Sequence, residues 1–386
     1  MPEVPDVRTH SDQVLRSLRQ SGPLTRGELG ELCGLSRTTL YEVVSRLVDQ
    51  GLVVATVPDA GPRGRGRPAE LLALNPDAGR VLGVDFGRRA VRVAAMAVLH
   101  DDVGTAVERC PADAPWPERV ALARRLADTL TGGRPRLDGF DGVGVSVTDP
   151  GAGSSAPADR RALATLVGRS FGTRVRLDAA PRLAALAETV RGAAAGQRDV
   201  LYLELSDRVG GGLVSAGALH HGAHGRSGEF GHITVEPAGP SCACGGRGCL
   251  QTVASTGAVL RAYRAAADVP DLTAALCAGE PAAHAAVRRA GTYAGRVLAG
   301  LANALAPGVV VVGGELVTAA PALMEAVRRE LAANVVRCGS RPPLPVRRAE
   351  LGEFAAALGA VFLLRRPTEA SRSKSGRRAF NPDPEY

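Results

Sequence analysis

Long apolar runs are absent from this chain of 386 residues. No stretch of about 18 apolar residues occurs, and a membrane-spanning helix needs roughly that length. The first residues, MPEVPDVRTHSDQ, also lack the basic start, apolar block and small-residue cleavage site of a secretory signal. These absences predict a cytoplasmic protein with no membrane partner.

Lysine and isoleucine are nearly absent, since Lys374 is the only lysine and Ile233 the only isoleucine. Such a preference for arginine indicates a GC-rich genome, so the formal net charge of +8 is weaker evidence for nucleic-acid binding than usual. Residues 1–76 hold nine Arg against nine Asp plus Glu. A role in DNA binding therefore has to be argued from pattern.

Cysteines are few and odd in number, with seven in the chain. In a cytosolic protein this number argues against a disulfide framework. Three of them, Cys242, Cys244 and Cys249, crowd into one short segment. The others lie among apolar neighbours and are expected to be small buried side chains: Cys33, Cys110, Cys277 and Cys338.

The N-terminal 75 residues carry the signals of a helix-turn-helix, in a chain long enough for two or three domains. Thr25-Arg-Gly-Glu28 fits a capping box, so a helix begins there and stops at Gly34. Ser36 can cap a second helix. The inner sides of the two helices are expected to carry Leu29, Leu32 and Cys33 in the first, and Leu40, Val43, Val44, Leu47 and Val48 in the second.

Two apolar runs, 52–57 and 70–74, follow the second helix and are joined by the turn-rich stretch PDAGPRGRGRP. They predict a β-hairpin wing, whose glycine-spaced arginines suit a phosphate or a narrow minor groove. A flexible linker is the alternative interpretation of the tip alone. After a helix-turn-helix, however, the pattern favours a winged helix on a double-stranded DNA operator. The expected DNA-binding residues are Ser36, Arg37, Thr38, Thr39, Tyr41, Arg63, Arg65 and Arg67.

The next three hundred residues alternate between apolar strand-like runs and Ala- and Leu-rich helical segments, which indicates an α/β fold. Expected strands are 81–86, 143–147, 200–205, 213–215 and 309–312. Expected helices lie near 117–131, 159–171, 180–195, 281–306 and 320–334. Beyond about residue 365 the sequence turns polar and basic, and a disordered tail is expected there.

A series of motifs in this region resembles the ROK family of repressors and sugar kinases. The motifs are Gly83-Val-Asp-Phe-Gly87, Asp178 just after a strand, Gly210-Gly-Gly212, Gly228-Glu229-Phe-Gly-His232, Cys242-Ala-Cys-Gly-Gly-Arg-Gly-Cys249 and Val309-Val-Val-Val-Gly-Gly314. The resemblance runs from about residue 10 to 365 and is closest to the ROK-type repressors. It implies an N-terminal winged helix-turn-helix domain (1–75), a two-lobed actin-like (ribonuclease H-like) ATPase/sugar-kinase fold (76–365) and a basic tail (366–386).

One imidazole and three thiols form a candidate metal site. His232, Cys242, Cys244 and Cys249 make a Cys₃His set suited to tetrahedral Zn²⁺ with no open position, which is the pattern of a structural site. The alternative is a set of reduced thiols in a glycine-rich loop. In the family that the chain resembles, the corresponding His also faces the sugar.

The resemblance also implies a sugar pocket. Asp178 aligns with the catalytic base of the family, Glu229 with its second sugar-contacting carboxylate, and Gln251 with a Glu of the pocket. The ligand-binding residues expected on this basis are Asp178, Glu229, His232 and Gln251. Leu177 replaces the Asn that usually precedes the base, so a modest affinity for a sugar or sugar derivative is expected.

The phosphate loops of the resembled kinases are altered here. The usual Asp-x-Gly-Gly-Thr hairpin reads Asp85-Phe-Gly-Arg-Arg89, and Ser206-Asp-Arg208 replaces Gly-Thr-Gly. Arginines can clamp phosphate, yet positioning is most of phosphoryl-transfer catalysis and both loops have lost their small residues. No catalytic residue is expected, and Asp178 is a vestigial base.

These motifs together predict a sugar-responsive transcriptional regulator, most simply a repressor, acting as a homodimer or tetramer. The sequence leaves two alternatives open. One is a bifunctional ROK sugar kinase fused to a DNA-binding domain. The other is a repressor whose sensor lobe binds a protein partner. His220, His221 and His224 show no ligand geometry and are expected to be loop residues.

Overall fold

A computed structural model describes residues 7–56, 70–75, 80–97, 102–131, 140–147, 157–336 and 343–365. The expected wing tip with Arg63, Arg65 and Arg67 lies outside the described residues, as do Cys338 and the expected tail. Within the described ranges, no helix is both long and apolar enough to cross a membrane.

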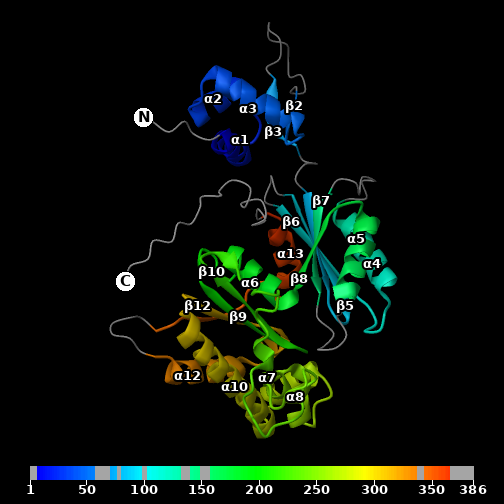
Figure 1. The fold of residues 1–386 in the computed structure, drawn as a ribbon, viewed down its shortest axis with the longest axis vertical. Helices are drawn as coiled ribbons and strands as arrows, with labels where there is room; N and C mark the ends of the chain where they lie inside the picture. The colour runs from blue at the N-terminus through cyan, green and yellow to red at the C-terminus, as the bar shows by residue number, and fades with distance from the viewer. Residues whose placement is uncertain are drawn as a thin grey trace, which may run out of the picture.

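The N-terminal unit packs helices against a small antiparallel sheet (Figure 1). Its elements are α1 (Val7–Ser21), β1 (Leu24–Thr25), α2 (Arg26–Cys33), α3 (Arg37–Asp49), β2 (Val53–Thr56) and β3 (Leu71–Leu74). The strand order is β1-β3-β2, and β2 pairs antiparallel with β3, which confirms the expected hairpin. The fold is therefore the predicted winged helix.

Local capping signals fix where its helices begin and end. The Thr25 amide donates to Glu28 Oε2 at 2.8 Å, and the Glu28 amide donates back to Thr25 Oγ1 at 3.3 Å, which confirms the capping box. Gly34 ends α2 in the left-handed conformation. Two expected core residues were wrong: Leu32 is 57% exposed and Val48 is 38% exposed, because each lies at the outer edge of its helix's apolar stripe.

The first lobe is a five-stranded sheet of order β6-β5-β4-β7-β8. Its elements are β4 (Arg80–Phe86), β5 (Ala90–Ala97), β6 (Asp102–Arg109), α4 (Trp116–Leu130), β7 (Phe140–Val147), α5 (Pro157–Phe171) and β8 (Val175–Ala179). The strands β6, β5 and β4 are antiparallel, while β4, β7 and β8 are parallel. Helices α4 and α5 pack their apolar sides on one face of this sheet.

The second lobe repeats this arrangement with the sheet order β11-β10-β9-β12-β13. Its strands are β9 (Val200–Leu205), β10 (Val209–Ser215), β11 (Ala218–Leu219), β12 (Val309–Gly313) and β13 (Val346–Arg348). Its helices are η2 (Phe230–His232), α7 (Leu250–Ala254), α8 (Thr256–Ala262), α9 (Val269–Cys277), α10 (Pro281–Leu305), α11 (Glu315–Ala319) and α12 (Pro321–Asn334). Both sheets have the same strand order in chain sequence, as the expected two-lobed actin-like fold requires.

Two helices connect the lobes, α6 (Ala180–Val190) and α13 (Ala355–Arg365), the second preceded by the turn η3 (Gly352–Phe354). They pack against each other between the sheets (Figure 1), and an added Cβ on Gly359 would overlap the Leu183 carbonyl oxygen. Helix α6 ends at Val190, so the expected extension to 195 was wrong. In its last turn the buried Glu188 accepts amide hydrogen bonds from Ala193, which follows α6, and from Glu350 and Leu351, which precede η3.

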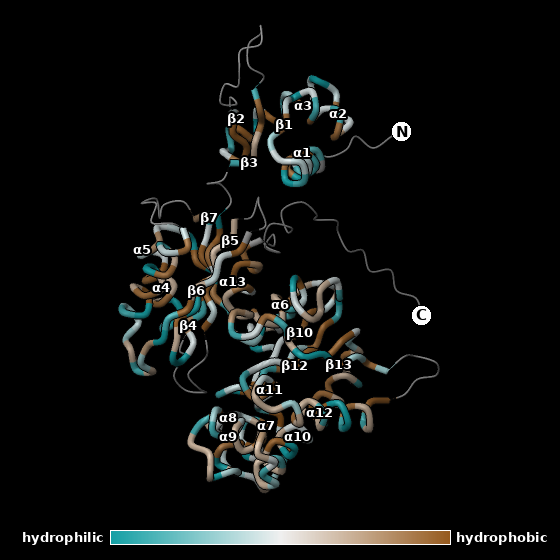
Figure 2. Tube along the Cα trace, turned by 180° about the vertical axis from the view of Figure 1, so that it is seen from behind, coloured by the Kyte–Doolittle hydropathy of each residue, from teal (hydrophilic) through white to brown (hydrophobic). Residues whose placement is uncertain are grey.

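Apolar residues gather on the strands and on the inner sides of the helices (Figure 2). The four valines of β12 are fully buried, which confirms the expected strand 309–312. Cys33 is buried as expected, whereas Cys277, at the end of α9, is exposed and that expectation was wrong. The edge between the two lobes is where the polar side chains of the candidate site collect.

Candidate functional site

The outer face of α3 carries the side chains expected to read DNA. Arg37, Thr38 and Tyr41 are exposed. Ser36 Oγ accepts a hydrogen bond from the Thr39 amide at 3.2 Å and lies 2.8 Å from Thr39 Oγ1. These two hydroxyls therefore fix the start of the helix, while the three exposed residues present side chains to solvent.

A further cation, which the sequence did not single out, lies beside this face. The guanidinium carbon of Arg26 is 5.5 Å from the ring centre of Tyr41, within reach of a cation–π interaction. Its Nη1 atom is 3.2 Å from Glu70 Oε2, directly before β3. Arg26 thus links the recognition helix to the base of the wing. Its place after Thr25 in the sequence gives no sign of either contact.

The four expected metal ligands converge in space. The ligand atoms of His232, Cys242, Cys244 and Cys249 all lie within 4.8 Å of one another. Cys244 Sγ is 3.6 Å from Cys249 Sγ, and Cys242 Sγ is 3.5 Å from His232 Nδ1. A tetrahedral ion with bonds of about 2.3 Å would hold its ligands roughly 3.8 Å apart. The group can therefore hold one metal ion.

The loop that carries the cysteines folds back on itself through Gly248. The φ of this residue is +58°, and a Cβ there would overlap the carbonyl oxygen of Glu236, so glycine is required. The Gly248 carbonyl accepts hydrogen bonds from the Val235 and Glu236 amides at 2.8 and 3.0 Å. A bridge between Thr234 and Cys249 completes the fold-back that brings the last thiol next to the histidine turn.

Thiol chemistry in this group fits a cation. Burial, reinforced by the neighbouring thiols, raises the pKa of Cys249 to about 12. The Gly246 backbone lowers the pKa of Cys244 by hydrogen bonding. Three adjacent thiolates repel one another unless a cation offsets their charge, and metal binding accordingly releases their protons.

A cleft of about 1,900 Å³ separates the two lobes. Its second-lobe wall includes Glu229, His232 and Gln251. His232 Nε2 lies 3.8 Å from Glu229 Oε2, whereas its Nδ1 faces Cys242. One ring nitrogen of His232 therefore faces the metal group, and the other faces the cleft. A metal on Nδ1 would leave a proton on Nε2, ready to donate towards the cleft.

Gln251 lines the cleft but its amide is committed to the backbone. Its Oε1 accepts a hydrogen bond from the Val209 amide at 2.6 Å, and its Nε2 donates to the Asp207 carbonyl at 3.2 Å. These contacts hold the turn between β9 and β10. The geometry gives Gln251 a part in shaping the cleft wall.

Asp178 is enclosed by other side chains, and it lies within β8, one residue before its end, so its expected place just after a strand was wrong. Its side chain is only 4% exposed, and Asp178 is not among the described residues that line the cleft. Arg182 Nε donates to Oδ1 at 2.7 Å, and His221 Nε2 lies 3.0 Å from Oδ2. Burial raises the pKa of Asp178, but the His221 hydrogen bond and the Arg182 charge outweigh it and hold the pKa below its usual value.

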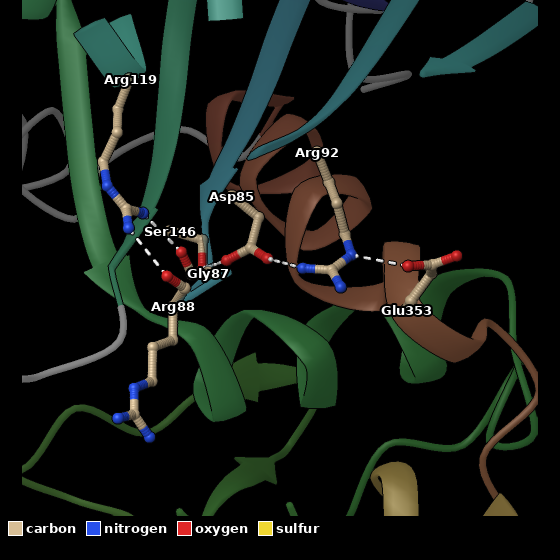
Figure 3. Close-up of polar contacts among 7 residues, drawn as sticks. All are labelled: Asp85, Gly87, Arg88, Arg92, Arg119, Ser146 and Glu353. Atoms are coloured by element: carbon tan, nitrogen blue, oxygen red, sulfur yellow. Dashed lines mark hydrogen bonds and ion pairs between the residues drawn. The ribbon is translucent and has the colours of Figure 1, made fainter. Parts of the chain in front are cut away.

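The first-lobe side of the cleft holds a chain of ion pairs (Figure 3). Ser146 Oγ donates to Asp85 Oδ1 at 2.7 Å, and Arg92 Nη1 donates to Asp85 Oδ2 at 3.3 Å. Arg92 Nε also donates to Glu353 Oε2 at 3.0 Å, at the turn before α13. Burial raises the pKa of Asp85 although both partners lower it. Asp85 is thus paired within the protein on both oxygens.

Arg119, from α4, holds the turn that follows Asp85. Its guanidinium donates to the carbonyls of Gly87 at 2.6 Å and Arg88 at 2.8 Å, as Figure 3 shows. Further bonds reach the Pro111, Ala112 and Ala114 carbonyls. The hairpin that corresponds to the first phosphate loop is therefore fixed from behind by a buried cation.

Comparison with known proteins identifies both parts of the chain. Residues 155–366 match the ROK family, and residues 13–54 match the winged helix-turn-helix DNA-binding family. The xylose repressor of Bacillus spizizenii is 26% identical over 365 residues, covering 90% of this chain and 92% of the repressor.

Two solved structures share the fold. A ROK hexokinase from Thermus thermophilus is 30% identical and covers 74% of this chain and all of its own, with a TM-score of 0.60. A ROK family transcriptional regulator, a homologue of the E. coli MLC protein, is 23% identical, with a TM-score of 0.65 over 93% of this chain and 96% of its own. The kinase lacks a counterpart for a quarter of this chain, whereas the regulator spans nearly all of it.

Proposed function

Because this chain belongs to the ROK family, we propose that it is a DNA-binding transcriptional repressor controlled by a sugar or sugar derivative. One observation carries the proposal: a winged helix with an exposed recognition face precedes a complete two-lobed sugar-kinase fold. The similarity to a xylose repressor, over nine-tenths of both chains, supports the same function.

Zinc is the metal that best suits the Cys₃His group. His232, Cys242, Cys244 and Cys249 would hold it as a closed set of four protein ligands. Bound zinc would stabilise the loop and fix the orientation of the His232 ring. His232 Nε2 and Glu229 would then present a donor and an acceptor to the hydroxyl groups of a sugar in the cleft.

The proposed repressor does not transfer a phosphoryl group to its sugar. Kinases of this class need backbone amides and a metal ion at the ATP phosphates. Here Asp85 is paired with Arg92, and the side chains of Arg88 and Asp207 occupy the two phosphate loops. Enclosed by Arg182 and His221, Asp178 is poorly placed to accept a proton from a sugar hydroxyl.

Control of DNA binding follows from coupling between the cleft and the winged helix. We take residues 1–75 as the DNA-binding domain, 76–365 as the sensor and 366–386 as a tail. A homodimer or tetramer would place two winged helices on a pseudo-palindromic operator. Sugar binding would close the lobes and change the spacing of the winged helices, and DNA would reciprocally weaken sugar binding.

Genomic footprinting with the full chain, followed by anisotropy on the recovered operator, tests this function. One of D-xylose, N-acetylglucosamine or D-glucose should weaken operator binding in a concentration-dependent way. Absence of any protected genomic site would refute the repressor. If a genomic site is protected but none of these sugars weakens binding to it, the effector would be another ligand or a protein partner.

A sugar kinase is the second candidate, because the Thermus thermophilus hexokinase is 30% identical to this chain. An assay of sugar-dependent ADP release separates the two functions. The pairing of Asp85 and the altered loops favour the repressor.

A further inference from the structure

Arg182, in the first turn of α6, is a buried cation on the wall of the cleft. Its side chain is only 5% exposed, and a buried guanidinium is costly unless partners inside the protein offset its charge. Nε and Nη2 bond the carboxylate of Asp178, at 2.7 and 2.5 Å from Oδ1. The third nitrogen, Nη1, donates to the carbonyl oxygen of Ser227 at 2.9 Å. Every nitrogen of this guanidinium is therefore engaged by the protein itself.

These bonds connect the two lobes at the edge of the cleft. Asp178 belongs to β8 in the sheet of the first lobe, whereas Ser227 lies between β11 and η2 in the second. His221, on the same connection as Ser227, bonds the other oxygen of Asp178, with 3.0 Å between Nε2 and Oδ2. The His221 carbonyl in turn accepts the Ser227 amide hydrogen bond at 3.0 Å. One carboxylate of the first lobe thus holds this connection of the second lobe through two side chains.

The segment Ser227–Glu229 lines the cleft, and its middle residue is closely packed. Gly228 has a φ of +96°, and a Cβ there would overlap the Gly211 carbonyl oxygen on β10. The Gly228 carbonyl accepts the Gly211 amide hydrogen bond at 2.8 Å, and Arg182 Cγ lies 3.6 Å from the position of that Cβ. Glu229 follows directly, so the place of its carboxylate in the cleft depends on where Ser227 and Gly228 are held.

Resting on the sugar-responsive function proposed above, we propose that Arg182 is the positioning residue for the segment Ser227–Glu229 and that Asp178 serves as its counter-ion. The sugar then meets Glu229, while Asp178 acts on the sugar only through Arg182. Glu229 lines the cleft and is 55% exposed, whereas Asp178 is buried and is not among the described residues that line it. A planar guanidinium suits this role, because it can bond a carboxylate and a carbonyl on two sides at once.

The buried charge of each partner makes the two roles separable. Burial raises the pKa of Asp178, but the His221 hydrogen bond and the Arg182 charge hold it below its usual value. Without Arg182 the carboxylate would keep only His221 as a side-chain partner, and the protein would be destabilised. If both charges are removed, neither is left unpaired. A double variant therefore reports whether Asp178 does anything beyond balancing the charge of Arg182.

Hydrogen exchange of the full chain, without any sugar, tests the positioning role. Arg182→Met keeps an unbranched apolar stem but removes every donor, so the amides of residues 222–232 should exchange about tenfold faster than in the wild type. Arg182→Lys should restore part of the protection. The matched control is Arg176→Met, because Arg176 Nη1 donates to the Leu363 carbonyl at 2.6 Å and does not bond this segment. Unchanged exchange in a folded Arg182→Met variant, or equal acceleration in Arg176→Met, would overturn the positioning role.

Sugar titrations distinguish a counter-ion from a ligand contact. In Arg182→Met, binding of whichever of D-xylose, N-acetylglucosamine or D-glucose acts on the wild type should weaken by about tenfold. Adding Asp178→Asn removes the unpaired carboxylate. The double variant should therefore bind the sugar no more weakly than Arg182→Met does, and it should unfold at a higher temperature. If Asp178 touched the sugar, the double variant would lose a further factor of about ten.

That further loss, or unchanged sugar affinity in Arg182→Met, would overturn the inference. If Arg182→Met does not fold, the double variant is compared with the wild type in both experiments, and a loss of about a hundredfold would then identify Asp178 as a ligand contact. If none of the three sugars binds the wild type, the sugar-responsive function fails. The exchange rates of residues 222–232 still decide in that case whether Arg182 positions the cleft wall.

Discussion

Arg88 of the first lobe forms an ion pair with Asp207 of the second, with 3.6 Å between Nη1 and Oδ2. The two residues belong to the turns that would surround the ATP phosphates in a kinase of this fold. Both side chains are more than half exposed, so the pair contributes little to stability. Its consequence is spatial, because side chains lie between the backbone of the two turns and any phosphate group.

Phosphorylation of sugars should therefore be undetectable. With Mg-ATP and D-xylose, N-acetylglucosamine or D-glucose, ADP formation should stay at least about a thousandfold below the 1–100 s⁻¹ typical of kinases. A coupled ADP assay measures it, with the Thermus thermophilus ROK hexokinase as positive control. Sugar-dependent turnover that disappears in Asp178→Asn would establish a kinase instead.

The wing arginines should set the strength of DNA binding. Replacing Arg65 and Arg67 by Ala should weaken binding to most sequences and lower the salt dependence by about 0.9 for each phosphate that is no longer neutralised. Anisotropy at several salt concentrations measures this slope. Arg125→Ala is the matched control, because Arg125 is an exposed arginine in the first lobe and lies outside the winged helix. An unchanged salt dependence would show that the wing does not bind DNA and is only a linker.

Arg26 and Tyr41 should act together at the recognition face. Arg26→Ala removes the cation over the Tyr41 ring and the ion pair to Glu70, both near the surface. DNA affinity should fall several-fold while the free energy of unfolding changes by less than about 1 kcal/mol. Arg37→Ala should instead change which operator sequence is preferred. If Arg26→Ala lowers stability and affinity in parallel, its role is in folding.

Zinc should be present at about one equivalent per chain. Elemental analysis after chelator-free purification measures it. Cys244→Ser should lower both the zinc content and the thermal unfolding midpoint, because it removes one of four converging ligands. Cys277→Ser, at an exposed cysteine outside the cluster, should change neither. Well under half an equivalent in the wild type would contradict a zinc site.

Local signals in the sequence predicted local structure well. The capping box of Thr25 and Glu28 depends on residues three apart, so it is visible in the sequence itself and is confirmed. Burial at the edge of a stripe depends on what packs against the helix, and so Leu32 and Val48 were wrongly placed in the core. In the apolar run that forms α13, the spacing of the apolar residues does not distinguish a helix from a strand. This helix was therefore not predicted.

Contacts across the fold could not be predicted from spacing. Asp178 and His221 are 43 residues apart, and Arg92 and Glu353 are 261 apart. The motif at Asp178 indicated a carboxylate near the sugar but gave no sign that Arg182 and His221 would enclose it. The metal site was easier to predict from the sequence, because three of its ligands lie within eight residues and only His232 comes from another segment.

Glu204, on β9, lines the cleft between the lobes and has an unusual pKa. Burial and the negative charge of Asp85 raise the pKa of Glu204 from its ordinary 4.5 to about 7. The folded protein therefore holds this proton more tightly than the unfolded chain does. The stability that comes from the protonated form is complete below pH 4.5 and is lost as the pH rises towards 7.

Glu204→Gln should remove this pH dependence and make the protein more stable than the wild type at pH 8. Between the two pKa values the wild type should lose up to about 1.4 kcal/mol per pH unit from this group, whereas glutamine cannot ionise. Urea unfolding at pH 5, 6, 7 and 8 measures the difference, which should shrink towards pH 5. Glu325→Gln, on the exposed side of α12, should follow the wild type at every pH. Parallel curves for Glu204→Gln and the wild type would show that Glu204 is ionised throughout, held by Ser206 and Arg92 against the repulsion of Asp85.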